Sequence, residues 1–432
     1  MTREEFARRW DPDKWDWKHD SGYLAAMYKE HFDIWWDPKR YNWKDASDSL
    51  VMCCKEHFHK WWDHERFNWK DASWALAQHC SKYFDTWWDP ERYDWEGASW
   101  ALATYCSTHF EKWWDPTRFN WVHASRELAT HCCEHIEKWR DPKRFNWKDA
   151  SWALAQHCCE YFDHWWDPAR FDWKDASWAL AQYCSKHFHK WWNPDKFNWK
   201  DASWALATYC SAHFEKWWDP EKFDYSGAAS HALARYCSKY FHKWWNSEKF
   251  DWEEGSAALV NHCSKYFETW WDPKRFNWKE GSKTLASRAA AHFHIWWDPD
   301  RFVWNVHTIR AMLKYHKDKI HIWAPHIKVH TTSPQCLEVL CANLAEYFEY
   351  WWPPFCESNK GLVMDPKYID CLGEHVPQYS HIWVIDLLKL VEETTDSVPA
   401  TVVLRLALWC AKSGNHVQRW FLRNTLQKEV SG

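Results

Sequence analysis

The sequence predicts an all-α protein: an α-solenoid of eleven tryptophan-rich 26-residue helical repeats with a helical C-terminal cap. Two observations carry this prediction. The Trp-Trp doublet recurs every 26 residues, with one step of 27, and a fixed period of this length is typical of solenoids. Only 9 of the 432 residues are glycine, against an average of about 7%, which disfavours hairpin-rich and dinucleotide-binding folds.

The repeats divide the chain into four predicted segments. We expect an N-terminal tail or cap over 1–10 and tandem repeats over 11–297. Degenerate repeats over 298–352 and a helical cap or small adaptor domain over 353–432 follow. Only 6 of the 45 Trp residues lie beyond residue 304. A terminal unit must present a polar outer face, so a weaker pattern is expected there.

Each repeat is numbered here from the residue that follows its Trp-Trp doublet, usually the Asp of Trp-Trp-Asp-Pro. One such repeat runs from Asp63 to Trp88. Asp followed by Pro is typical of a helix start, so we expect a short helix from Pro38 to about Lys44. We expect a break at positions 9 and 10, where glycines recur. These are Gly97, Gly227, Gly255 and Gly281. A second helix of about 16 residues should then run to the Trp pair.

One continuous helix is the alternative, since Asn68-Trp69-Lys70-Asp71 resembles a capping box. It would make neighbouring helices alternate in direction and should produce a 52-residue superperiod, which the sequence lacks. The short-helix, long-helix unit is therefore preferred. The architecture resembles α-solenoids such as tetratricopeptide and armadillo arrays, although period and residues match neither.

The overall composition favours an intracellular location, in the cytoplasm. The 55 basic and 60 acidic residues give a net charge of −5, which calls for no polyanionic partner. No apolar run is long enough to cross a membrane, so no membrane association is expected. The start of the chain lacks the apolar core of a secretory signal. The seventeen cysteines show no zinc-ribbon spacing, and we expect them to be reduced.

Metal binding, cofactors and catalysis are not expected. His131 and His135 are spaced to chelate a metal if one helix holds both, and His157-Cys158-Cys159 is similar. The cysteine at position 18, however, recurs at the centre of the apolar arc, where it acts as a small hydrophobe. The sequence also lacks motifs for nucleophilic, phosphate-binding or metal-dependent catalysis. Only the cap holds an alternative cluster, of ordinary spacing: Cys371, His375, His381 and Asp386.

A basic residue followed by an aromatic one recurs at positions 4 and 5, which suggests single-stranded nucleic-acid binding as the alternative function. Such modules could contact phosphates and stack bases, one nucleotide per repeat. The acids at positions 1 and 9 offer each basic residue an internal partner, so a structural ladder is preferred. The candidate contacts are Arg66, Arg92, Arg118, Arg144 and Arg170.

The preferred function is a non-enzymatic scaffold or adaptor that binds partner proteins of unknown identity. Positions 16, 20 and 23 vary between repeats on a constant frame, as in repeat proteins that tune a binding surface. The candidate partner-binding residues are Gln78, Lys82, Asp85, Thr104, Thr108, Glu111, Gln156, Glu160, Gln182 and Lys186.

Overall fold

The structure, a computed structural model, describes residues 1–327, 334–358, 360–363, 365–393 and 400–412. All regular elements in these ranges are helices, which confirms the all-α solenoid of Trp-rich repeats. The chain forms two compact units, Met1–Asp224 and Tyr225–Gly432. The boundary falls beside Gly227, in the one repeat with an extra residue. Gly227 is the only described residue with a positive φ, at 53°, which a residue without Cβ adopts freely.

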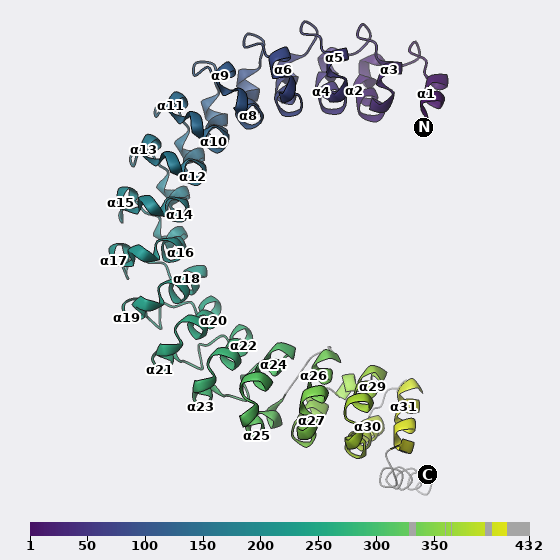
Figure 1. The fold of residues 1–432 in the computed structure, drawn as a ribbon, viewed down its shortest axis with the longest axis vertical. Coiled ribbons are helices and arrows are strands. Elements are labelled where there is room, and N and C mark those ends of the chain that lie inside the picture. Colours follow the sequence, from purple (N-terminus) through teal and green to yellow (C-terminus); the bar gives the residue numbers. More distant parts are fainter. Residues whose placement is uncertain (328–333, 359, 364, 394–399, 413–432) are drawn as a thin grey trace. The chain divides into compact units, whose positions relative to one another are not determined.

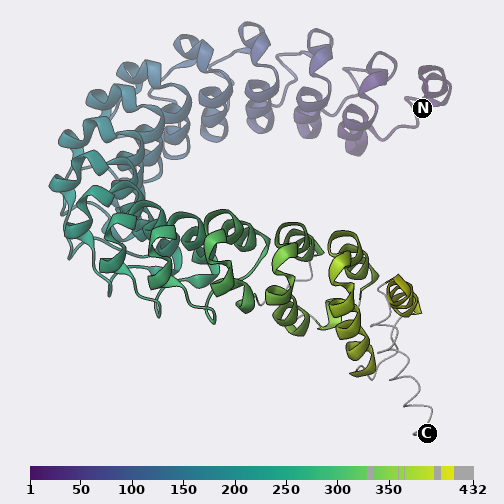
Figure 2. The same cartoon turned by 60° about the horizontal axis from the view of Figure 1, so that its bottom comes forward.

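Unit 1 begins with α1 (Arg3–Arg9), which is followed by one 11-residue helix per repeat. These long helices are α2 (Trp17–Met27), α4 (Trp43–Cys53), α6 (Trp69–His79), α8 (Trp95–Tyr105), α10 (Trp121–His131), α12 (Trp147–His157), α14 (Trp173–Tyr183) and α16 (Trp199–Tyr209). They lie side by side in one row (Figures 1 and 2).

Each long helix of unit 1 leads through a 3-10 turn into a single α-helical turn that ends at the first Trp of the doublet. The 3-10 turns are η1 (Lys29–His31), η2 (Lys55–His57), η3 (Ser81–Tyr83), η4 (Ser107–His109), η5 (Cys133–His135), η6 (Cys159–Tyr161), η7 (Ser185–His187) and η8 (Ser211–His213). The short helices, which form a second row, are α3 (Phe32–Trp35), α5 (Phe58–Trp61), α7 (Phe84–Trp87), α9 (Phe110–Trp113), α11 (Ile136–Trp139), α13 (Phe162–Trp165), α15 (Phe188–Trp191) and α17 (Phe214–Trp217).

Unit 2 continues the same pattern as far as α25. Its elements are α18 (Ala228–Tyr236), η9 (Ser238–Tyr240), α19 (Phe241–Trp244), α20 (Trp252–His262), η10 (Ser264–Tyr266), α21 (Phe267–Trp270), α22 (Trp278–Arg288), η11 (Ala290–His292), α23 (Phe293–Trp296), α24 (Val306–Tyr315), η12 (Lys317–Lys319) and α25 (Ile320–Trp323). The rest are η13 (Ala324–His326), α26 (Pro334–Leu344), η14 (Ala345–Tyr347), α27 (Phe348–Ser358), α28 (Lys360–Val363), α29 (Pro366–His375), η15 (Pro377–Tyr379), α30 (Ser380–Glu393) and α31 (Ala400–Lys412).

The expected helix over Pro38–Lys44 is wrong, because the Asp-Pro segment forms a turn. The Asp141 carboxylate, before Pro142, accepts hydrogen bonds from the backbone N–H groups of Lys143 and Arg144, at 2.9 and 3.3 Å. The indole N–H at position 7 donates to the carbonyl at position 2, as in Trp43 to Pro38 at 2.9 Å. These bonds close the turn before the helix begins.

The expected break at positions 9 and 10 is present beside Gly227, where α18 begins at Ala228. It is wrong for the repeats of unit 1, because their long helix begins earlier, at position 7. The Asn68 side chain caps it, accepting from the backbone N–H of Asp71 at 3.3 Å. Gly97, Gly255 and Gly281 therefore lie inside helices. The break comes instead at position 18.

The expected 16-residue helix is interrupted at this position, where Cys80 leaves helical geometry with φ −122° and ψ 22°. Its carbonyl accepts the indole N–H of Trp87 at 2.8 Å, so the helix end stays satisfied although it is buried. The first Trp of each doublet thus folds the short helix back over the end of the long one. Its ring is almost completely buried in every repeat of unit 1.

Candidate protein-binding surface

The residues predicted to bind partners lie on two different parts of the repeat. Position 16 lies on the long helix and is half-buried, as at Gln78, Thr104, Gln156 and Gln182. Positions 20 and 23 lie beyond the break, on the 3-10 turns and short helices, and their side chains are exposed. They include Lys82, Asp85, Thr108, Glu111, Glu160 and Lys186. The structure therefore does not bring the predicted stripe together as one surface.

Most of the charged residues of that stripe form ion pairs between neighbouring repeats. Lys112 lies 2.5 Å from Asp85, and Lys186 lies 2.5 Å from Glu160. The hydrogen bond from Lys112 lowers the pKa of Asp85 below its usual value. These pairs are solvent-exposed and each contributes little to stability, but they occupy the side chains that a partner would have to contact.

A different surface follows the long helices of unit 1, and sequence reasoning missed it. Position 12 carries Trp in five repeats, and each of these rings is only half-buried. They are Trp74, Trp100, Trp152, Trp178 and Trp204. The sequence signal was available, since position 12 is four residues before the variable position 16 and shares its helix face.

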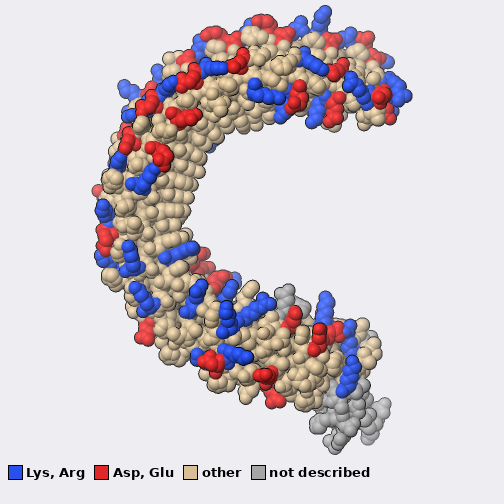
Figure 3. All heavy atoms as spheres, viewed as in Figure 1, with Lys and Arg blue, Asp and Glu red and all other residues tan. Residues whose placement is uncertain are grey.

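Aromatic neighbours at position 17 extend this surface. The Trp100 and Tyr105 rings meet edge to face at 6.2 Å, as do those of Trp178 and Tyr183. The Tyr105 side chain is 38% exposed. Figure 3 shows an uncharged band alongside α12 and α14. We call the surface made by positions 12, 16 and 17 of α6 to α16, which includes Arg126 on α10, the aromatic face.

The five arginines considered for nucleic-acid binding are all engaged within the array. Each donates to the carbonyl at position 2 of the preceding repeat, as Arg66 does to Pro38 at 2.6 Å and Arg144 to Pro116 at 2.5 Å. Arg92 donates to His64 at 3.3 Å, while Arg118 and Arg170 bond to the Pro90 and Pro142 carbonyls.

Carboxylates complete these arginine contacts. Arg92 and Arg118 lie 2.6 Å from Glu65 and Glu91 of the preceding repeats. The hydrogen bond that Arg92 donates lowers the pKa of Glu65, and the one that Arg118 donates to Glu91 raises the pKa of Arg118. An internal ladder is thus present at these residues, but its acids are at position 3 of the preceding repeat and position 1 of the same repeat, and the expected pairing with position 9 is not seen at Arg92 or Arg118.

The cysteine at position 18 is a core residue, as expected. Cys80 and its equivalents in the neighbouring repeats are fully buried, and burial raises the pKa of the Cys80 thiol to about 12. The Cys106 thiol donates to the carbonyl of Ala77 in the preceding repeat at 3.7 Å. Such thiols stay protonated at neutral pH, which makes them poor metal ligands.

The expectation that every cysteine is reduced is wrong for one pair. Cys133 at position 19 forms a disulfide with Cys158 at position 18 of the next repeat, with Cα atoms 5.4 Å apart. The repeat places the same two positions together at Cys159 and Cys184, which are free thiols joined by a hydrogen bond. That bond lowers the pKa of Cys159 to about 7.

The chelating pair of histidines proposed as a metal site does not form on one helix. His131 ends α10, the helix breaks at Cys132, and His135 ends the following 3-10 turn. The His135 ring instead stacks on Phe110 at 4.3 Å. Among the residues that the structure describes, no group of three or more His, Cys, Asp or Glu side chains could hold a metal ion.

Two of the four residues in the alternative cluster of the cap are hydrogen-bonded to residues outside that cluster. The Asp386 carboxylate accepts the indole N–H of Trp352 at 3.0 Å. The Cys371 thiol is hydrogen-bonded to Cys341, which lowers its pKa. His375 ends α29, and His381 lies in the first turn of α30.

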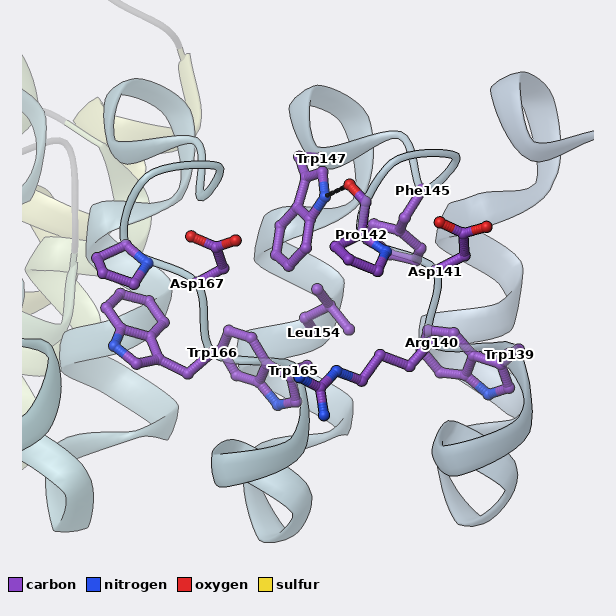
Figure 4. Close-up of a pocket in the computed structure, with 11 residues that line it drawn as sticks. Trp139, Arg140, Asp141, Pro142, Phe145, Trp147, Leu154, Trp165, Trp166 and Asp167 are labelled. Atoms are coloured by element: carbon purple, nitrogen blue, oxygen red, sulfur yellow. Dashed lines mark hydrogen bonds between the residues drawn. The ribbon is translucent and has the colours of Figure 1, made fainter.

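One repeat of unit 1 contains a pocket. Arg140 stands where the second Trp of the doublet is found in the other repeats. A pocket of about 170 Å³ opens here, between the rings of two consecutive repeats (Figure 4). Its lining is Trp139, Arg140, Asp141, Pro142, Phe145, Trp147, Leu154, Trp165, Trp166, Asp167 and Pro168.

Each described helix is too short or too polar to span a lipid bilayer.

Neither the protein-family models, nor the curated protein sequences, nor the solved structures contain a match to this chain.

Proposed function

We propose that this protein is a non-enzymatic intracellular scaffold that binds partner proteins through the aromatic face of unit 1. One observation carries the proposal: half-exposed Trp rings recur at position 12 on five of the six long helices from α6 to α16, the exception being Arg126 on α10. Contiguous exposed apolar surface of this kind marks interaction sites. Trp and Tyr are also the side chains that contribute most to binding at protein interfaces.

The chain itself indicates that these rings are not needed for folding. Other repeats carry Arg126, Ala257 or Lys283 at position 12 and still form the same 11-residue helix. The polar groups beside the rings are internally bonded, as with the Thr104 hydroxyl, which donates to the Trp100 carbonyl at 2.8 Å. A partner would therefore bury mainly aromatic surface.

Single-stranded nucleic-acid binding is the weaker candidate. The internal bonds of Arg66, Arg92, Arg118, Arg144 and Arg170 would have to break before these side chains could contact phosphates. Buried free thiols in successive repeats, such as Cys80, Cys106 and Cys132, support an intracellular site of action.

The test is affinity capture from the source cell with quantitative mass spectrometry, with and without nuclease. The wild type is compared with W100A/W178A, which copies Ala257. The matched control is D85A/K112A, which removes an exposed ion pair between the short helices. We expect proteins held by the wild type and the control, unaffected by nuclease and lost from W100A/W178A. Capture that is unchanged in W100A/W178A, or that nuclease abolishes, would contradict the proposal.

A further inference from the structure

We propose that the pocket beside Arg140 binds a planar aromatic ring of indole size that carries a carboxylate. This site lies between two repeats of unit 1 and is independent of the aromatic face. Its shape, its lining and its charge each point to this class of ligand.

The other repeats show which group fits the corresponding space. In the preceding repeat, Trp114 stacks on Phe110 at 5.1 Å and meets the edge of Trp121 at 5.5 Å. Trp114 also contacts Phe119 at 5.2 Å. An indole thus fills this space between two aromatic neighbours wherever the doublet is complete.

In the repeat that ends at Arg140, the surrounding rings do not close the gap. Trp139 and Phe145 lie 5.7 Å apart, close to the 6.1 Å between Trp113 and Phe119. Position 22 is also smaller here, because Ile136 replaces the usual Phe. The remaining volume, about 170 Å³, exceeds the roughly 150 Å³ of an engineered apolar cavity that binds benzene.

Arg140 gives the pocket a charge preference. Its side chain is exposed, reaches towards Trp165 in Figure 4, and forms no ion pair with any residue that the structure describes. The two lining carboxylates are already engaged. Asp141 lies 3.4 Å from Arg144, and Asp167 lies 3.3 Å from Arg170.

The free charge at the pocket is therefore the guanidinium of Arg140, which favours a ligand with an anionic group next to its ring. The ring can belong to a free aromatic acid, or to a Trp side chain that precedes an acidic residue in a peptide. The ring chemistry is the same in both cases.

The experiment titrates the full-length protein by isothermal calorimetry and ligand-observed NMR. The probes are indole-3-acetate, uncharged indole, cationic tryptamine and a capped Trp-Asp dipeptide. We expect one site per chain, with indole-3-acetate about three- to fivefold tighter than indole, the effect of one partly exposed ion pair. Tryptamine should bind most weakly. If the dipeptide binds more tightly than indole-3-acetate, the source is a peptide, and the reverse order indicates a free aromatic acid.

Three variants locate the site. R140W restores the repeat's own indole and should abolish binding of every probe. R140Q keeps the space and should bind indole as the wild type does, while losing the preference for indole-3-acetate. R126W is the matched control, because it also restores a consensus Trp in the same repeat but lies outside the pocket.

R126W should bind like the wild type. Failure of all four probes to bind wild type, or undiminished binding to R140W, would overturn the proposal. R140Q keeps this test valid if R140W does not fold: equal preference for indole-3-acetate in R140Q and wild type would exclude the role of Arg140.

Discussion

The hydroxyl of Ser99 accepts a hydrogen bond from the backbone N–H of Asn120 at 3.0 Å, and this bond joins one repeat to the next. The same hydroxyl donates to the carbonyl of Trp95, one turn earlier in its own helix, at 2.5 Å. Asn120 in turn caps the following long helix, accepting from His123 at 3.2 Å. One buried serine per repeat therefore connects a helix interior to the start of its neighbour.

We expect S99A to destabilise the protein by about 1–3 kcal/mol, because it leaves the backbone N–H of Asn120 without its partner. The measurement is urea unfolding followed by circular dichroism. The matched control is S107A at position 19, where Ala290 already stands in another repeat. Equal loss in both variants would show that the inter-repeat bond has no special role.

Deleting one whole repeat, residues 89–114, should leave a folded, helical protein. The deletion brings Trp88 before Asp115 and so preserves the order of contacts between neighbouring repeats. Deleting only residues 99–114 should be far more damaging, because it removes most of a long helix while keeping the turn before it. Circular dichroism and thermal melting distinguish the two. An unfolded 26-residue deletion beside a folded 16-residue one would contradict the repeat model.

Reduction of the Cys133–Cys158 disulfide should lower the melting temperature. The bond closes a loop of 25 residues, for which chain-entropy arguments give about 3 kcal/mol. C133S should melt at the lower temperature with or without reductant. C159S is the control and should keep the sensitivity of the wild type to reductant. A wild type that melts identically in both conditions would contradict the prediction.

The fold class could be predicted from the sequence because the 26-residue period and the apolar positions are visible without coordinates. The helix boundaries could not, because hydrogen bonds between side chains and backbone determine them. The Asp141 carboxylate accepts from the N–H groups of Lys143 and Arg144 and so closes a turn, and the Trp87 indole donates to the carbonyl of Cys80. Asp-Pro and a recurrent glycine favour a helix start and a break, and these side-chain bonds override both signals.

For the candidate surface too, some features could be predicted from the sequence and others could not. The pairing of the arginines could be predicted, because acids recur at the same period. The exposure of Trp74 and its equivalents was missed although position 12 shares a helix face with the variable position 16, since a helical projection alone does not tell which arc faces a neighbouring repeat. The disulfide was missed because positions 18 and 19 are adjacent in sequence, and only the stacking of repeats brings position 19 of one against position 18 of the next.

Unit 2 should lose stability as pH falls through the region around 6.5. His316 follows α24 as the position 18 cysteines follow the other long helices, is fully buried, and bonds through Nε2 to the carbonyl of Ala286 at 2.8 Å. Burial lowers its pKa below the usual value, while Lys319 lowers it further and Asp318 raises it. The folded state therefore keeps His316 neutral at pH values where the unfolded chain takes up a proton. By linkage, its contribution is full above pH 6.5 and decreases below it.

The matched variant is H316C, which restores the residue found at this position in most repeats. Urea midpoints at pH 7.5 and 5.5 should differ less in H316C than in the wild type. H307C, at the exposed start of α24, is the control and should retain the wild-type difference. An unchanged pH dependence in H316C would assign the effect to other histidines.

One variant distinguishes a protein-binding scaffold from a protein that binds nucleic acid. It changes four arginines together to Gln: Arg66, Arg92, Arg118 and Arg144. Each arginine holds a carbonyl of the preceding repeat, so the variant should melt a few degrees below the wild type. Fluorescence anisotropy with labelled single-stranded DNA and RNA at two salt concentrations gives the second measurement. We expect wild-type binding no tighter than about 10 μM at physiological salt, the ordinary non-specific range.

The control for this variant changes four exposed lysines of the long helices to Gln, since they carry the same charge without the carbonyl contacts. These are Lys44, Lys70, Lys148 and Lys174. The lysine variant should melt at the same temperature as the wild type. The lower melting temperature of the arginine variant would then be due to the lost contacts between repeats and not to the lost charge. Sub-micromolar, salt-dependent affinity that disappears only in the arginine variant, with its melting temperature unchanged, would require those side chains to face phosphates. The scaffold proposal would then be wrong.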